Sequence, residues 1–228
     1  MALTMYHSQW GENRPIRGVL FDMDGLVVDT EKLYSRFWRE ACAVYGYEMS
    51  YEQSLNMRGL GGQAGERMLQ SFFGSGVDYL QLRNKRIELM DAFVDEHGVE
   101  LKPGIFELMD FLEEAGIPAA ITSSSPIPRI RKFLAPYGLD SRFRALCSGR
   151  DVPRGKPAPD IYLAGAAALG LPAESCLALE DAPAGAESAF RAGCLTVMIP
   201  DLDPPSEEVK KMLYARADFL GEIPRLLK

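Results

Sequence analysis

The sequence predicts an α/β fold: a Rossmann-like parallel sheet core with helices on both faces, plus an inserted all-helical cap domain. From residue 103 to residue 199, short apolar strand patterns alternate with helical ones, which is typical of parallel strands joined by crossover helices. One further strand pattern precedes residues 30–98, where no strand pattern occurs. We therefore expect a catalytic core of residues 14–29 and 99–228 and a helical cap of residues 30–98, inserted after the first strand.

The N-terminal elements begin with a buried strand that ends at Phe21, directly before Asp22. Apolar residues at helical spacing predict a helix over 30–45, which Asp29 can cap. Ser50 and Gln53 form a capping-box pattern, the glycines of residues 59–65 predict a turn, and residues 80–97 form a long, charged helical stretch.

The C-terminal elements alternate regularly. We expect helices over 103–114, 127–137, 159–169 and 182–192, and strands over 117–122, 145–147, 176–179 and 195–199, with short elements up to residue 228. Ligands of such a sheet bind at the carboxyl ends of the strands.

Composition restricts the classes of partner. The net charge is −7 and no run of Lys or Arg offsets it, so binding to nucleic acid is not expected. The four cysteines are widely spaced, and no segment has about 18 uninterrupted apolar residues or resembles a signal peptide. We expect a cytoplasmic protein that does not bind membranes. The sequence does not decide the role of residues 1–13 or identify protein partners.

Polar residues follow three of the predicted strands. Asp22 and Asp24 follow the first, and the other two are followed by Thr122 with Ser123 and by Glu180 with Asp181. These side chains are expected at one edge of the sheet. Lys156, in a stiff turn rich in proline, supplies the cation that such a group of carboxylates needs.

This set of residues suits phosphoryl transfer. A carboxylate can attack phosphorus, so Asp22 is the candidate nucleophile, and Asp24 could protonate the leaving oxygen and later accept a proton from water. Asp22, the Asp24 carbonyl and Asp181 could bind Mg²⁺, which prefers hard oxygen ligands. The Thr122 hydroxyl, the Ser123 amide and Lys156 could hold phosphate oxygens, with Glu180 near the metal or orienting Lys156.

The ordered motifs resemble those of the haloacid dehalogenase superfamily. They are Asp22-Met23-Asp24-Gly25, Thr122 after its strand, Lys156 in GKPAPD, and Glu180-Asp181 followed by Gly185. FDMDGLVVDTE and KPAPDIY resemble the β-phosphoglucomutase-like group, whose helical cap follows the first core strand. The resemblance covers residues 16 to 200. It implies magnesium, an aspartyl-phosphate intermediate and hydrolysis of a small-molecule phosphate ester.

The cap and the catalytic motif supply the candidate substrate contacts. Arg58 precedes the glycine-rich segment of residues 59–65 and Gln63 lies within it. Both could contact the leaving group of the substrate. Met23, between the two catalytic carboxylates, is a further candidate for substrate binding. The physiological substrate is not evident, because specificity resides in the cap.

Two alternatives remain open. A phosphosugar mutase of the β-phosphoglucomutase type would carry a cap histidine where Tyr34 stands and a cap arginine near Gly62, and neither is present. A phosphorylatable binding module without enzymatic activity would not need Asp24 for hydrolysis. Phosphate release and Asp24→Asn separate these alternatives from a phosphatase.

Overall fold

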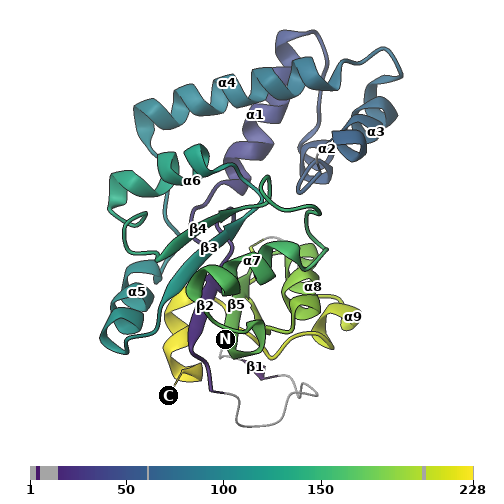
Figure 1. Cartoon of the computed structure of the whole chain (residues 1–228). Helices are drawn as coiled ribbons and strands as arrows, with labels where there is room; N and C mark the ends of the chain where they lie inside the picture. The colour runs from purple at the N-terminus through teal and green to yellow at the C-terminus, as the bar shows by residue number, and fades with distance from the viewer. Residues whose placement is uncertain (1–3, 6–14, 61, 202–203, 228) are drawn as a thin grey trace. The chain divides into compact units, whose positions relative to one another are not determined.

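The computed structural model describes residues 4–5, 15–60, 62–201 and 204–227. The chain divides into two compact units (Figure 1), a core unit of Met1–Val28 and Leu101–Lys228 and an inserted unit of Asp29–Glu100. The two connecting segments pair with each other, because Val28 and Leu101 form an antiparallel bridge. The predicted boundaries at residues 29 and 99 lie within two residues of this division. The role of the inserted unit as a cap stays a prediction.

The core unit is built on one sheet with the strand order β1-β7-β6-β5-β2-β3-β4. All neighbouring pairs are parallel except β1 with β7. The strands are β1 Thr4–Met5, β2 Gly18–Phe21, β3 Ala119–Ser123, β4 Ala145–Ser148, β5 Cys176–Glu180, β6 Leu195–Met198 and β7 Ala215–Arg216. The predicted Rossmann-like fold is confirmed, and β2 lies in the middle of the sheet between β5 and β3.

Helices cover the sheet of the core unit. Figure 1 shows α7 and α8 together on one side, and α7 packs on β2, β3 and β4 while α8 packs on β5 and β6. The α-helices of this unit are α5 Ile105–Glu114, α6 Ile127–Leu134, α7 Asp160–Leu169, α8 Pro183–Ala192 and α9 Glu207–Lys210. The 3₁₀ helices are η1 Ala135–Tyr137, η2 Ala173–Ser175 and η3 Leu220–Leu226, and η3 packs against α5.

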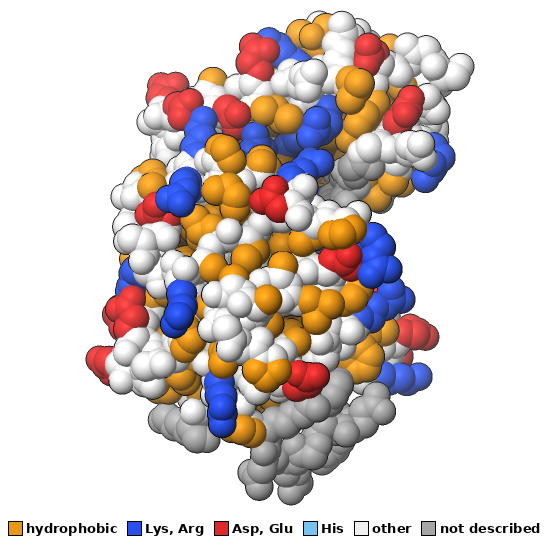
Figure 2. All heavy atoms as spheres, in the orientation of Figure 1, with side chains coloured by type: hydrophobic (Ala, Val, Ile, Leu, Met, Phe, Trp, Pro, Cys, Tyr) orange, Lys and Arg blue, Asp and Glu red, His pale blue; other side chains and the backbone are white. Residues whose placement is uncertain are grey.

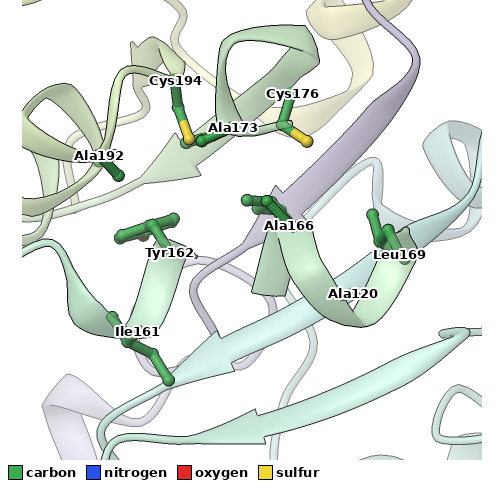
Figure 3. Packing of buried hydrophobic residues seen from close by; sticks show 12 residues of the cluster. Ala120, Ile161, Tyr162, Ala166, Leu169, Ala173, Cys176, Ala192 and Cys194 are labelled. Atoms are coloured by element: carbon green, nitrogen blue, oxygen red, sulfur yellow. The ribbon is translucent and has the colours of Figure 1, made fainter. Parts of the chain in front are cut away.

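The interior of the core unit is apolar. Figure 3 shows the cluster between the sheet and the helices α7 and α8, where Tyr162 and Ala166 of α7 meet Cys176 at the start of β5 and Cys194 before β6. The β2 residues Val19, Leu20 and Phe21 are completely buried. Burial on both faces is what a central parallel strand requires, and it explains the unbroken apolar run before Asp22.

The inserted unit is entirely helical within the described residues. It consists of α1 Glu31–Val44, α2 Tyr51–Asn56, α3 Gly62–Phe73 and α4 Tyr79–His97, and it has an apolar core of its own around Trp38, Leu69 and Leu82. The predicted capping box at Ser50 and Gln53 is present.

One sequence expectation for the inserted unit is wrong. The glycines of residues 59–65 predict a turn, but α3 begins at Gly62 and contains Gly65. Glycine is a poor helix former, so local propensity indicates a loop. Gly65 is retained because a Cβ there would lie 2.7 Å from the ring of Tyr79. Close packing against α4 therefore explains this glycine.

The surface carries side chains of both charge signs. On the face drawn in Figure 2, most basic side chains lie scattered among acidic and neutral ones. Across the described part of the chain, every helix is too short or too polar to span a membrane.

Candidate active site

The candidate site lies at the carboxyl edge of β2, β3 and β5. Asp22 directly follows β2, Ser123 ends β3, and Glu180 ends β5 with Asp181 next to it. The backbone N–H of Asp22 donates to the carbonyl of Leu179 at 3.0 Å, which continues the pairing of β2 with β5 up to the candidate nucleophile. The parallel register of three adjacent strands therefore brings these side chains to one place.

A tight turn follows Asp22. The carbonyl of Met23 accepts hydrogen bonds from the backbone N–H groups of residues 26–28. Gly25 has φ of 87°, a left-handed conformation that glycine adopts without strain. The Met23 side chain is fully buried, so any contact of Met23 with a substrate would come from its backbone.

Lys156 bridges two carboxylates. Its Nζ lies 2.5 Å from Oδ1 of Asp22 and 2.6 Å from Oε1 of Glu180. The side chains of Lys156, Asp22 and Glu180 are 11%, 10% and 1% exposed. A buried ammonium group needs paired acceptors, and here two strands supply one each. The cation is thereby fixed beside the candidate nucleophile.

A third carboxylate completes a candidate metal centre. Oxygen atoms of Asp22, Glu180 and Asp181 lie within 4.8 Å of one another. Hard, anionic oxygens in a partly dry site form the donor set that magnesium prefers, and Lys156 contacts two of these three carboxylates. The residues therefore fit a divalent cation.

Burial and crowding shift the ionisation of this cluster. Burial raises the pKa of Asp22 to about 8; Lys156 opposes this shift, and the carboxylates of Glu180 and Asp24 add to it. Burial alone would lower the pKa of the Lys156 ammonium, but Asp22 and Glu180 together raise it above its ordinary value. In the metal-free site, burial and the neighbouring carboxylates therefore disfavour the charged form of Asp22, and a bound cation would oppose that shift.

Asp24 is held by hydroxyl groups. Ser125 Oγ donates to Oδ2 of Asp24 at 3.0 Å, and Ser123 Oγ donates to the same oxygen at 3.4 Å. Ser125 in turn donates its backbone N–H to Ser123 Oγ. The only sequence signal for Ser125 is its place in the polar run of residues 122–125. These serines fix the side chain that is the candidate acid and base.

Thr122 and Ser123 point in different directions. The Thr122 hydroxyl donates to the carbonyl of Phe21 at 3.1 Å, and a Cβ on Gly165 of α7 would touch its methyl group at 2.5 Å. The expected contact of this hydroxyl with a phosphate oxygen therefore has no support from the geometry. Alternate residues of a strand face opposite sides, so the Ser123 hydroxyl, next to Asp24, is the better candidate.

Tyr162 is a second residue that sequence reasoning missed. It lies in the first turn of α7, fully buried, and its hydroxyl donates to Oε1 of Glu180. Burial, and next the Glu180 carboxylate, raise the pKa of Tyr162 well above its ordinary value. Its only sequence signal was its place in the segment KPAPDIY.

Arg58 and Gln63 belong to the inserted unit. Arg58 Nε donates to the carbonyl of Leu55 at 3.0 Å, and Gln63 is exposed in the first turn of α3. Their contact with a leaving group stays a prediction. Trp38, on α1 of the same unit, is buried in its apolar cluster.

Comparison with known proteins identifies the family. The family model for haloacid dehalogenase-like hydrolases matches residues 16–193, which include all the core-unit residues of the candidate site. The chain belongs to this family. The predicted resemblance and the prediction of an enzyme that hydrolyses phosphoric monoesters are thus confirmed, since several relatives are named phosphatases.

Individual relatives cover most of the chain. Hexitol phosphatase A of Escherichia coli is 33% identical over 202 residues, which are 87% of this chain and 91% of the relative. The probable pseudouridine-5′-phosphatase of Drosophila melanogaster is 30% identical over 221 residues, 92% of this chain and 94% of the relative. The crystal structure of CbbY from Rhodobacter sphaeroides in complex with phosphate superposes with a TM-score of 0.77 at 26% identity, covering 91% of this chain and 96% of that one.

Proposed function

We propose that this member of the haloacid dehalogenase-like family is a magnesium-dependent phosphatase. Its substrate would be a small phosphorylated metabolite, a sugar or polyol phosphate or a nucleotide-like monoester, and its intermediate an aspartyl-phosphate on Asp22. The observation that supports this most is the contact of Lys156 with Asp22 and Glu180 beside Asp181, with Asp24 two residues after the nucleophile.

The first step forms a bond between a carboxylate oxygen of Asp22 and phosphorus. The ester P–O bond breaks, and the leaving alkoxide takes the proton of the Asp24 carboxyl group. Ser125 and Ser123 donate to Oδ2 of Asp24 and so orient its carboxyl group for this transfer. The Lys156 ammonium stabilises the negative charge on the phosphoryl oxygens.

The second step returns the enzyme to its starting state. Asp24, now a carboxylate, takes a proton from water as the water oxygen attacks phosphorus. The bond between phosphorus and Asp22 breaks, so inorganic phosphate and free Asp22 are released. Asp22, Asp181 and the Asp24 carbonyl would hold Mg²⁺, with Glu180 as a further oxygen donor. The bound cation would offset the repulsion between the carboxylates and the phosphate.

The inserted unit is proposed to act as the cap. It begins at Asp29, five residues after Asp24, so the chain that leaves the catalytic turn enters it directly. Arg58 and Gln63 would contact the leaving group, and closure would exclude bulk water. The hexitol and pseudouridine phosphatases among the relatives support a monophosphate of a polyol or nucleoside as substrate.

The test is phosphate release from a panel of hexitol phosphates, aldose phosphates and pseudouridine 5′-phosphate, with magnesium and with EDTA. We expect release that requires the metal and is abolished in Asp22→Asn. If no panel member releases phosphate, and an isomeric sugar phosphate forms once a sugar bisphosphate is added, the enzyme is a mutase instead.

A further inference from the structure

Tyr162 contacts both partners in the ion pair beside the nucleophile. Its hydroxyl donates to Oε1 of Glu180, the same oxygen that accepts from Lys156 Nζ at 2.6 Å. The Lys156 ammonium also lies 5.2 Å from the centroid of the Tyr162 ring. Tyr162 is therefore linked to Asp22 through Glu180 and Lys156, in a sequence of contacts that starts inside the protein and ends at the candidate nucleophile.

The ring of Tyr162 is rigidly placed. It is fully buried in the apolar cluster of α7, the sheet and α8, as Figure 3 shows for its labelled neighbours. Lys156 precedes α7 and Tyr162 lies in its first turn, six residues later, so one short segment supplies both donors to Glu180. A fixed phenol can orient a carboxylate because it has few rotatable bonds and its hydroxyl is buried with the carboxylate.

Glu180 needs such a partner because its carboxylate could bind either Lys156 or a metal ion. It lies within reach of both Lys156 and the candidate metal ligands Asp22 and Asp181. With Oε1 bound by the Tyr162 hydroxyl, Lys156 is shared between Glu180 and Asp22. Without that hydroxyl, Glu180 could turn away from Lys156, and the ammonium would move from the position in which it meets the phosphoryl oxygens.

We propose that Tyr162 is a positioning residue of this site, whose hydroxyl holds Glu180 so that Glu180 keeps Lys156 in place beside Asp22. The role of Tyr162 in turnover rests on the proposed phosphatase function, whereas the positioning of Lys156 by Tyr162 and Glu180 does not. The two can therefore be tested separately.

The first experiment measures the position of Lys156 directly, in the metal-free protein. The ¹⁵N signal of its side-chain ammonium is identified by its absence in Lys156→Met. We expect this signal to shift in Tyr162→Phe, which keeps the ring, and to stay in place in Tyr214→Phe, a control in the same unit. An unchanged Lys156 signal in Tyr162→Phe would overturn the proposal, whatever the enzyme turns out to hydrolyse.

A double-mutant cycle tests whether Tyr162 acts through Glu180. In a Glu180→Gln background, adding Tyr162→Phe should change the Lys156 signal much less than it does in the wild type, because the residue through which it acts is already altered. An equal change in both backgrounds contradicts the proposal. Thermal unfolding of each variant shows whether a change in the Lys156 signal comes from misfolding.

Kinetics supply the functional result. Lys156 meets charge that develops in the transition state, so Tyr162→Phe should lower kcat by about tenfold and leave KM within about twofold. Tyr214→Phe should leave both constants unchanged. A kcat equal to that of the wild type would contradict positioning in catalysis. If the wild type released no phosphate at all, the proposed function would fail, and the ammonium signal would still decide the positioning.

Discussion

The carboxyl group of Glu180 lies directly against the backbone of Gly185. A Cβ at position 185 would lie 2.1 Å from the carboxyl carbon and from both carboxyl oxygens of Glu180. Gly185 lies in the first turn of α8, where the N-terminal end of a helix favours a negative charge. The absence of a side chain at Gly185 therefore makes room for the carboxylate that binds Lys156.

Gly185→Ala should displace Glu180 and lower activity. Glycine to alanine within a helix ordinarily stabilises by about 1 kcal/mol, but overpacking here should cost about 1–3 kcal/mol. We expect a lower melting temperature and a kcat reduced by at least about tenfold, since Lys156 loses a fixed partner. Gly76→Ala is the matched control, because a Cβ there meets no atom within 4 Å. A kcat in Gly185→Ala equal to that of the wild type would show that the Glu180 carboxylate does not need the space left by the glycine.

Lys156→Met should destabilise the metal-free protein. It leaves the buried carboxylates of Asp22 and Glu180 without their shared cation, and loss of one partner of a buried pair costs about 3–5 kcal/mol. The loss should be smaller at pH 5 than at pH 8, because a protonated carboxyl group needs no cation. Urea unfolding at both pH values measures this. An equal loss at both would show that the carboxylates do not depend on Lys156 for their charge.

Ser123→Ala should lower kcat/KM more than Thr122→Val does. The Ser123 hydroxyl lies 3.4 Å from Asp24, whereas the Thr122 hydroxyl is bound to the Phe21 carbonyl. Thr122→Val should instead cost stability, by about 1 kcal/mol for the lost hydrogen bond. Steady-state kinetics and urea unfolding of both variants check this. A larger kinetic loss in Thr122→Val would restore the original expectation for Thr122.

The buried thiols should react slowly in the native protein. Burial raises the pKa of Cys176 to about 11 and that of Cys42 to about 12, and only the thiolate reacts. At pH 8 a disulfide reagent should modify half-buried Cys147 before it modifies the three buried thiols. This early reaction should be absent in Cys147→Ser. The thiols have lower pKa values in the unfolded chain than in the folded one. Above pH 9 the buried thiols therefore make the free energy of unfolding fall as pH rises. Rapid modification of Cys42 at pH 8 would contradict its burial.

Much of the site was predictable because parallel strands align their carboxyl ends. This rule predicts that Asp22, Glu180 and Asp181 lie together, and their charge predicts a cation, Lys156, beside them. In the structure Lys156 contacts Asp22 and Glu180, and oxygens of the three acids lie within 4.8 Å of one another. The rule does not say which of two consecutive residues faces the site. That depends on the phase of the pleat, so Thr122 was favoured where Ser123 lies beside Asp24.

Other features depend on packing between distant segments. In the sequence, Tyr162 occupies an ordinary apolar position of α7. Its hydroxyl becomes relevant only because Glu180, at the end of β5, accepts a hydrogen bond from it. Likewise, the pairing of Thr4–Met5 with β7 at the edge of the sheet leaves no signal in so short a segment. Local pattern and propensity cannot report such contacts, because they arise from tertiary context.

Trapping a covalent phosphoryl intermediate on Asp22 is the most direct test of the proposed phosphatase mechanism. With acetyl phosphate, whose leaving group needs no proton, Asp24→Asn should still form the intermediate but hydrolyse it slowly. Mass spectrometry of the acid-quenched variant should find one phosphoryl group on the peptide that contains Asp22, and none in the double variant with Asp22→Asn. Phosphate release at the wild-type rate without any label on Asp22, or a label on another residue, would contradict the account.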